Sequence, residues 1–218
     1  MNRSLRQALM VWAVGLGLGA SLQIGADAAQ PPTAGQGGVM VFTEPSPLDF
    51  ADHQGYMPLF DGKSLKGWDG NPKFWRVENG AIVGESTPAN PSGNSYIVYR
   101  DLVAKDFTLK FEIKIEGDGG SGIQYRSRTG LPWLANIPAN VTANVGPVNL
   151  NWMMTGPQAD FWPSRVYTGQ FYSENTPMRI LAWRGQVVEG FGAAGLFGIE
   201  LEAITKVFVR NIWVRKLT

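Results

Sequence analysis

The sequence predicts an all-β domain built as a β-sandwich or jelly roll. Apolar and polar residues alternate without a break from Phe107 to Glu116, which is typical of a strand with one face in a core and one in water. Asn79 and Gly80 stand between two apolar runs, and both residues accept the positive φ of a type I′ hairpin turn. Many short strand-like segments, 27 glycines and no helical period beyond the N-terminal segment complete the argument.

The expected strands follow one another at short spacing. The hairpin around Asn79–Gly80 comes first and the long alternating strand second. Residues 118–122 (Asp-Gly-Gly-Ser-Gly) then turn the chain into a strand that places Gln124 and Arg126 on one face. In the last strand the apolar phase shifts around Asn211, which predicts a β-bulge. The expected strands cover residues 75–78, 81–84, 107–116, 123–128, 179–188, 196–201 and 206–217.

The N-terminal segment predicts export. Arg3 and Arg6 precede an apolar stretch over residues 8–25, and Ala26-Asp27-Ala28 forms a small-x-small cleavage site. The alternative is a membrane anchor, but glycines and polar residues interrupt the run, so we expect no stable membrane insertion after cleavage. The expected location is the periplasm or the exterior.

The expected division of the chain has three parts. Residues 30–38 (Gln-Pro-Pro-Thr-Ala-Gly-Gln-Gly-Gly) have the composition of a flexible linker, and folded structure is expected from about Tyr56. The predicted parts are a signal peptide over 1–28, a flexible linker over 29–55 and one folded domain over 56–218.

Composition excludes several classes of function. Without Arg3, Arg6 and Asp27 the chain has equal numbers of basic and acidic residues, whereas nucleic-acid binding requires a basic face. The absence of cysteine excludes disulfides, thiol nucleophiles and an N-terminal lipidated cysteine. His53 is the only histidine, so a histidine zinc site or a Ser-His-Asp triad has no support. We therefore expect no metal and no cofactor.

Residues 129–160 form the least regular part of the predicted domain. They are rich in Asn, Pro and Gly and contain Trp133, Trp152 and the pair Met153–Met154. A connection of this length in a compact domain is either functional or disordered, and the tryptophans argue against disorder.

Acidic, basic and amide side chains on these strands form the strongest candidate site. Carboxylates suit acid–base chemistry on sugars, and aromatic rings suit stacking on sugar faces. Each residue alone also fits a structural ion pair, and Trp152, Trp162 and Trp183 fit packing as well as binding. The constellation consists of Glu85, Arg126, Gln158, Asp160, Glu174 and Arg184.

Five blocks of sequence give the chain a family resemblance. They begin with Leu-Phe-Asp-Gly-Lys-Ser-Leu-Lys-Gly-Trp and include Ser-Gly-Ile-Gln-Tyr-Arg-Ser, Gln-Ala-Asp and Arg-Ile-Leu-Ala-Trp-Arg-Gly-Gln. In the family's order they cover residues 59–68, 75–90, 106–127, 158–186 and 207–217. Over residues 57–217 the chain thus resembles the 3-keto-disaccharide hydrolases, extracytoplasmic proteins that cleave sugars oxidised at carbon 3.

The resemblance implies a concanavalin A-like jelly roll and a lyase–hydratase route to hydrolysis. A base removes the proton on carbon 2, the enolate expels the glycosidic oxygen from carbon 1, and water adds to the enone. The expected base is Asp160 or Glu85, and the expected donor to the enolate oxygen is Arg126 or Arg184. The expected substrate-binding residues are Gln124, Gln158, Glu174, Trp183 and Arg184, and the expected partner is an oligosaccharide or glycoside.

The chain departs from the family pattern at two places. Pro157 stands where the family commonly has an aromatic residue, in Gly-Pro-Gln-Ala-Asp. After residues 185–188 the sequence passes directly to residues 195–199, where the family has several dozen more residues that form strands. This shortening predicts an unpaired sheet edge.

Two other functions fit the same fold class. One is a sugar-binding module that keeps the sheet without turnover, and the other is a structural envelope protein without a cleft. The oligomeric state stays open, and a partner subunit is one way to cover the predicted edge.

Overall fold

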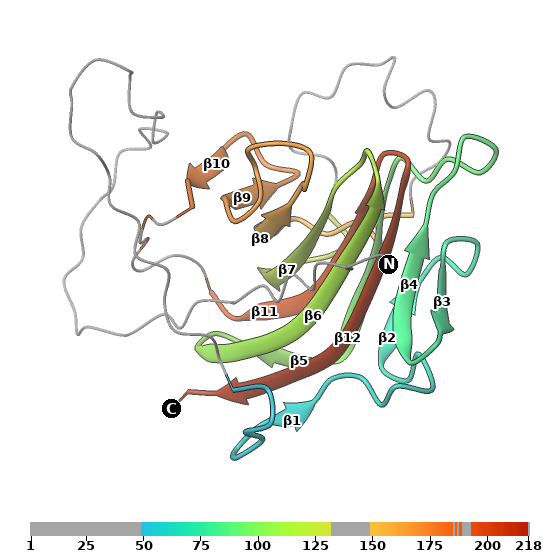
Figure 1. Ribbon diagram of the computed structural model, residues 1–218. Coiled ribbons are helices and arrows are strands. Elements are labelled where there is room, and N and C mark those ends of the chain that lie inside the picture. Colours follow the sequence, from blue (N-terminus) through green and yellow to red (C-terminus); the bar gives the residue numbers. More distant parts are fainter. Residues whose placement is uncertain (1–48, 132–148, 185, 187, 189–192, 218) are drawn as a thin grey trace, which may run out of the picture.

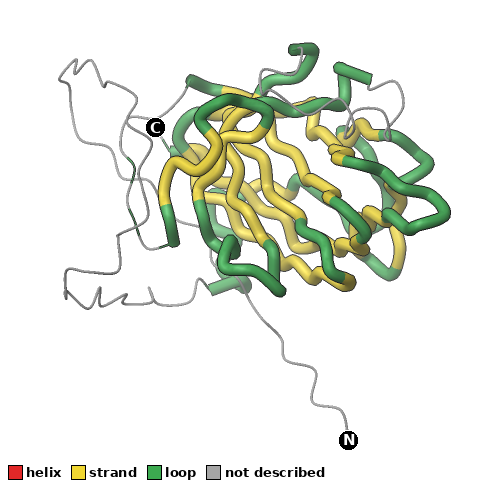
Figure 2. The backbone as a smooth tube through the Cα atoms, turned by 90° about the horizontal axis from the view of Figure 1, so that it is seen from above, coloured by secondary structure: helices red, strands yellow, loops and turns green. Residues whose placement is uncertain are grey.

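The computed structural model describes residues 49–131, 149–184, 186, 188 and 193–217, and its regular structure in these residues consists of β-strands (Figure 2). The predicted signal peptide and most of the predicted linker lie outside the described residues. In the described part of the chain, no helix is long and apolar enough to cross a membrane.

Two curved antiparallel sheets pack face to face (Figure 1). Sheet A contains β1 (Met57–Pro58), β3 (Trp75–Glu78), β4 (Ala81–Glu85), β6 (Phe107–Gly117) and β12 (Thr205–Lys216). Sheet B has the order β10–β9–β8–β7–β11–β5–β2. Its strands are β2 (Trp68–Gly70), β5 (Asn94–Ala104), β7 (Ser121–Ser127), β8 (Gly156–Phe161), β9 (Phe171–Glu174), β10 (Arg179–Ala182) and β11 (Gly195–Glu202). The predicted all-β jelly-roll class is confirmed.

The two local signals of the sequence are confirmed in sheet A. Asn79 and Gly80 have φ values of 50° and 76° and join β3 to β4 as the type I′ turn requires. The bulge lies where the phase shift predicts it, because the pairing of β12 with β6 changes register between Arg210 and Trp213 and Asn211 has a φ of 50°. The strand predicted over 179–188 is shorter than expected and ends at Ala182.

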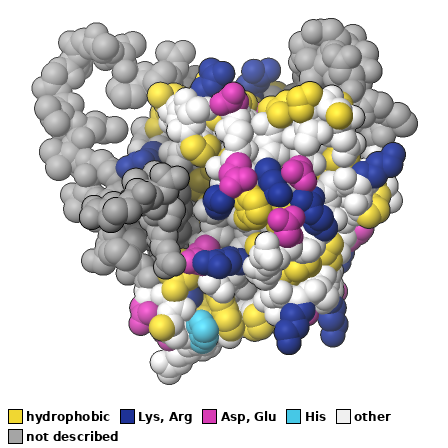
Figure 3. Space-filling view, turned by 45° about the vertical axis from the view of Figure 1, so that its right-hand side comes forward, with side chains coloured by type: hydrophobic (Ala, Val, Ile, Leu, Met, Phe, Trp, Pro, Cys, Tyr) yellow, Lys and Arg dark blue, Asp and Glu magenta, His cyan; other side chains and the backbone are white. Residues whose placement is uncertain are grey.

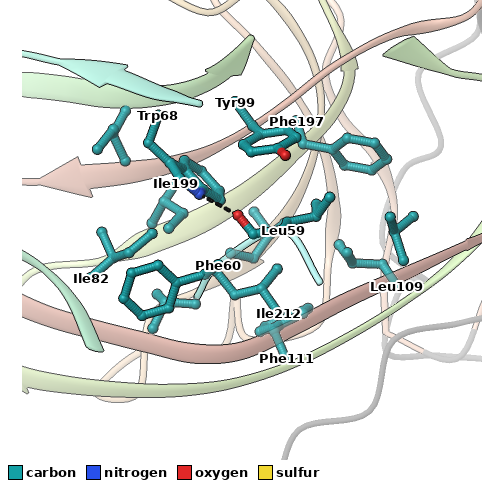
Figure 4. Close-up of a cluster of buried hydrophobic side chains, with 14 of the residues drawn as sticks. Leu59, Phe60, Trp68, Ile82, Tyr99, Leu109, Phe111, Phe197, Ile199 and Ile212 are labelled. Atoms are coloured by element: carbon teal, nitrogen blue, oxygen red, sulfur yellow. Dashed lines mark hydrogen bonds between the residues drawn. The ribbon is translucent and has the colours of Figure 1, made fainter. Parts of the chain in front are cut away.

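The core lies between the sheets and is built from the inward face of each strand. Trp68 and Trp75 are buried, and Trp68 Nε1 donates to the Leu59 carbonyl at 2.7 Å (Figure 4). Ile82 and Ile199 approach this tryptophan from opposite sheets. Burying a large apolar side chain of this kind stabilises the fold by about 1.5–3 kcal/mol.

Residues 49–56 cover the outward face of β6 at one end. The Lys110 side chain is 1% exposed, although the alternation of β6 places it on the face of the sheet that points away from the core. Its Nζ donates to the carbonyls of Asp49 and Asp52 and lies 4.0 Å from the centre of the Tyr56 ring. Close by, the ring of His53 stacks on Trp213 with a centroid distance of 3.8 Å. These contacts hold the segment against the sheet.

One side of sheet A ends at β6. This strand pairs with β12 from Phe107 to Gly117, and no other described strand pairs with it. Phe107, Ile113 and Ile115 point to the core but are only partly buried. Within the described residues β6 is therefore an edge strand of sheet A.

Candidate functional site

The candidate site lies on the face of sheet B that points away from the core. Ile123 on β7 and Phe161 on β8 pack into the core cluster. Because side chains alternate along a strand, their neighbours Gln124, Gln158 and Asp160 project from the opposite face. Polar side chains are thus concentrated on one face by the period-two pattern.

Strand register brings these side chains together. On β7, Gly122 is opposite Asp160 and Gln124 is opposite Gln158, both on β8. On the other side of β7, Gln124 is opposite Gly198 on β11. The polar residues of three adjacent strands therefore meet over β7.

Gly122 leaves room for a side chain to cross β7. A Cβ atom at this position would lie 2.3 Å from Cδ of Gln158. In the space of the missing side chain, Gln158 Nε2 donates to Oε2 of Glu200 at 2.7 Å and lies 3.5 Å from Oδ1 of Asp160. Gln158 thereby connects β8 to β11 across the intervening strand.

Glu200 is fully buried and is held by three donors. Besides Gln158, the Tyr96 hydroxyl donates to its Oε1 at 2.9 Å and Asn94 Nδ2 donates to the same oxygen at 3.1 Å. Burial and then the negative charges of neighbouring carboxylates raise the pKa of Glu200 well above its ordinary value.

Asp160 is a buried carboxyl that accepts hydrogen bonds from side-chain amides. It is 6% exposed, and Gln170 Nε2 donates to its Oδ2. Burial raises the pKa of Asp160 to about 6 against the opposing effect of hydrogen bonds from Gln170, the Phe161 amide and Gln158. This carboxyl changes its charge close to neutral pH.

Glu174 on β9 and Glu202 on β11 extend the group. Burial and then the charge of Asp160 raise the pKa of Glu174 to about 7. Burial and then the charges of Glu174 and Asp160 raise the pKa of Glu202 to about 8. We call Asp160, Glu174, Glu200 and Glu202 the acid cluster. Near pH 7 it holds both carboxylates and carboxylic acids, as acid–base chemistry requires.

Two members of the acid cluster were missed in the sequence. Glu200 and Glu202 belong to β11, which was predicted as a strand, but no role was predicted for them. Their alternation with Ile199 and Leu201 could have identified them as polar residues of a half-buried strand. Their closeness to Asp160 and Glu174 depends on the order of the strands in sheet B.

Two of the predicted residues lie elsewhere. Glu85 is in sheet A, where its carboxylate lies 2.7 Å from Arg76 and 3.7 Å from Lys206. Figure 3 brings the side with β3 and β4 forward and shows acidic and basic side chains interspersed there. Arg126, the residue before the end of β7, has a φ of 51°, pairs with Asp106 at 3.2 Å and donates to the carbonyl of Lys105. These contacts of Glu85 and Arg126 are with residues outside the acid cluster.

Trp183 and Arg184 follow β10 at the border of the site. The Arg184 side chain packs over Gly169, where a Cβ would lie 3.0 Å from its Cδ. Gly169 N–H donates to the carbonyl of Asp160 at 2.8 Å, so this stem lies near the backbone of Asp160. The Trp183 Nε1 atom is buried without a described hydrogen-bond partner.

The described end of the irregular segment covers part of the same face. Met153 and Met154 pack on Tyr96, and Asn175 Nδ2 donates to the Met154 carbonyl at 2.7 Å. Trp152 Nε1 donates to Asp69 at 2.7 Å. Trp133 lies outside the described residues.

Metal-site geometry is not found in the described residues. No group of three or more His, Asp or Glu side chains there has an arrangement that could hold a metal ion. The expectation of a metal-free site stays a prediction.

Comparison with known proteins gives a family model and several individual matches. The model of the 3-keto-alpha-glucoside-1,2-lyase-like domain matches residues 55–189. A 3-keto-disaccharide hydrolase of Bacteroides thetaiotaomicron is 34% identical over 83 residues, which are 34% of this chain and 28% of that protein. The chain thus spans less than a third of the length of that relative.

Two solved structures from Parabacteroides distasonis, both named with the words glycosyl hydrolase, are more distant. They are 18% and 20% identical, with TM-scores of 0.41 and 0.37. The matches cover 76% and 75% of this chain and 95% and 84% of those chains.

Proposed function

Because this chain belongs to the 3-keto-alpha-glucoside-1,2-lyase-like domain family, we propose that it is a carbohydrate-active enzyme whose acid cluster cleaves glycosides with a ketone at carbon 3. The observation that carries the proposal is the set of carboxyl groups with pKa values of about 6, 7 and 8 on one face of sheet B. A base and an acid are then available together near neutral pH.

In the proposed reaction Asp160 is the base. The ketone acidifies the proton on carbon 2, the Asp160 carboxylate takes that proton, and the resulting enolate expels the glycosidic oxygen from carbon 1. Glu174 or Glu202, still protonated near pH 7, supplies a proton to the leaving oxygen. Water then adds its hydroxyl to carbon 1 of the enone and its hydrogen to carbon 2, so elimination and hydration sum to hydrolysis.

The other predicted residues hold the substrate in this scheme. Arg184 is the proposed donor to the enolate oxygen, since its stem lies beside the backbone that carries Asp160. Gln124 Nε2 donates a hydrogen bond to Gln158 Oε1, so the two side-chain amides lie together. They are the proposed hydrogen-bonding partners of the sugar hydroxyls. Arg126 is the weaker choice as a donor because Asp106 already engages it.

A 3-keto-glucoside with a chromogenic leaving group tests the proposal. We expect release of the leaving group by the wild-type chain and a fall of about 10²–10⁴-fold in kcat/KM for Asp160→Asn, the range for loss of a general base. Glu85→Gln is the matched control, because it neutralises the other predicted base, on the opposite sheet. Far-UV circular dichroism on each sample reports folding.

The outcomes separate the candidate functions. Full turnover by folded Asp160→Asn would remove Asp160 as the base, and a loss confined to Glu85→Gln would move the chemistry to sheet A. A folded wild-type chain that binds the ketoglycoside without turnover would instead support the sugar-binding module.

Export is part of the proposal. A mature N-terminus near Ala29, read by sequencing the chain purified from the periplasm or the medium of an expressing bacterium, would support cleavage after Ala28.

A further inference from the structure

The edge of β6 with which no described strand pairs has a charge pattern that complements itself. Lys110, Glu112, Lys114 and Glu116 alternate in sign along the outward face of the strand. Of these side chains, Glu112, Lys114 and Glu116 are 38%, 67% and 48% exposed. In an antiparallel pair, residues directly opposite each other share a face and interact. The order of the charges therefore decides which pairings of two such strands are favourable.

Two copies of β6 related by a two-fold axis can be paired in several registers. With the axis at Ile113, Glu112 lies opposite Lys114 of the second copy, and Lys114 opposite its Glu112. Moving the axis by one residue places Glu112 opposite Glu112, or Lys114 opposite Lys114, which is repulsive. The register centred on Ile115 overlaps less within β6, and the register centred on Phe111 overlaps equally but places Lys114 opposite Thr108. The register centred on Ile113 instead adds a second complementary pair, Lys110 opposite Glu116.

The core side of the strand also favours a neighbour at this edge. Phe107, Ile113 and Ile115 belong to the border of the core cluster and are only partly buried where sheet A ends. A further strand beside β6 would cover them and bond the backbone groups that no described strand engages.

We propose that two copies of this chain form a two-fold dimer in which their β6 strands pair antiparallel about Ile113 and join the two A sheets into one. The occupant of the edge is thus a second copy, because the strand supplies its own complementary charges.

Cysteine cross-linking tests both the dimer and its register, because the chain has no native cysteine. With the axis at Ile113, an Ile113→Cys variant has its two cysteines directly opposite, with Cβ atoms about 4.5–5.5 Å apart. Ile115→Cys is the matched control: the residue is equally apolar and partly buried, but its two copies would be offset by four residues, about 13 Å. Mild oxidation of the full chain should give covalent dimers for Ile113→Cys and monomers for Ile115→Cys.

Analytical ultracentrifugation of the wild-type chain supplies the second measurement. We expect a dimer, and a Kd raised at least tenfold by Lys114→Glu, which places four acidic side chains around the axis. Lys66→Glu makes the same charge change at an exposed site off the strand and should leave the Kd unchanged. A wild-type monomer, equal cross-linking of both cysteine variants, or equal effects of both lysine variants would overturn the proposal.

Discussion

The outward faces of the two sheets carry the same kind of group in opposite surroundings. On sheet A, Glu78 and Glu85 lie among Arg76 and Lys206, and the hydrogen bond from Arg76 lowers the pKa of Glu78. On sheet B, burial raises the pKa of Asp160, whose carboxylate accepts a hydrogen bond from the amide of Gln170. The comparison teaches that a carboxyl group in this fold becomes suited to proton transfer when burial dominates its pKa.

The largest expected difference between the faces is the pH dependence of stability. The pKa of Asp160 is raised from 3.8 to about 6, so the folded chain binds this proton more tightly than the unfolded chain. The contribution is fully present below about pH 4 and is lost as the pH rises through about 6. For Asp160 alone the loss is on the order of 3 kcal/mol.

Urea unfolding at pH 5 and pH 8 measures this loss. We expect the wild-type free energy of unfolding to be lower at pH 8, and Asp160→Asn to reduce the difference. Glu85→Gln should leave it unchanged, and an equal reduction by both variants would contradict the contrast between the sheets.

The next effect is expected at Gly122, the position that lets Gln158 cross β7. Gly122→Ala should destabilise the fold by about 1–3 kcal/mol, because the new Cβ would overlap Gln158. The double variant with Gln158→Ala relieves the overlap, so the two losses should not add. Additive losses in urea unfolding would show that Gln158 does not lie over the glycine.

The smallest effect is expected on sheet A. Lys206 Nζ lies 3.6 Å from Glu78 and 3.7 Å from Glu85 at a partly exposed site. Lys206→Ala should therefore cost less than about 1 kcal/mol, and less again at high salt. A loss of stability as large as that of Gly122→Ala would contradict the expectation that these partly exposed ion pairs contribute little.

Local features of the fold could be predicted from sequence, whereas long-range pairing could not. The turn at Asn79–Gly80 and the bulge at Asn211 depend on a few neighbouring residues, and both are confirmed. Strands β5, β8 and β9 were not predicted. Residues 157–161 (Pro-Gln-Ala-Asp-Phe) alternate, but the run is short and starts with a proline, and its place in the sheet depends on its partners on β7 and β9.

The candidate site was predicted in part for the same reason. Asp160, Glu174, Gln124 and Gln158 were chosen from motifs, and the structure brings them to one face of sheet B. Glu85 was chosen by the same reasoning but lies on the other sheet. Polar motifs identify candidates, and the order of strands decides which of them meet.

The segment over residues 49–56 has a chemical consequence. Lys110 and Lys114 stand four residues apart on the same face of β6, yet only Lys114 is open to solvent. The Lys110 ammonium group donates hydrogen bonds to the carbonyls of Asp49 and Asp52. Reagents that acylate lysines can reach Lys114 directly, whereas they can reach Lys110 only after this segment has peeled away. The rate at which Lys110 is acylated therefore reports how often residues 49–56 open.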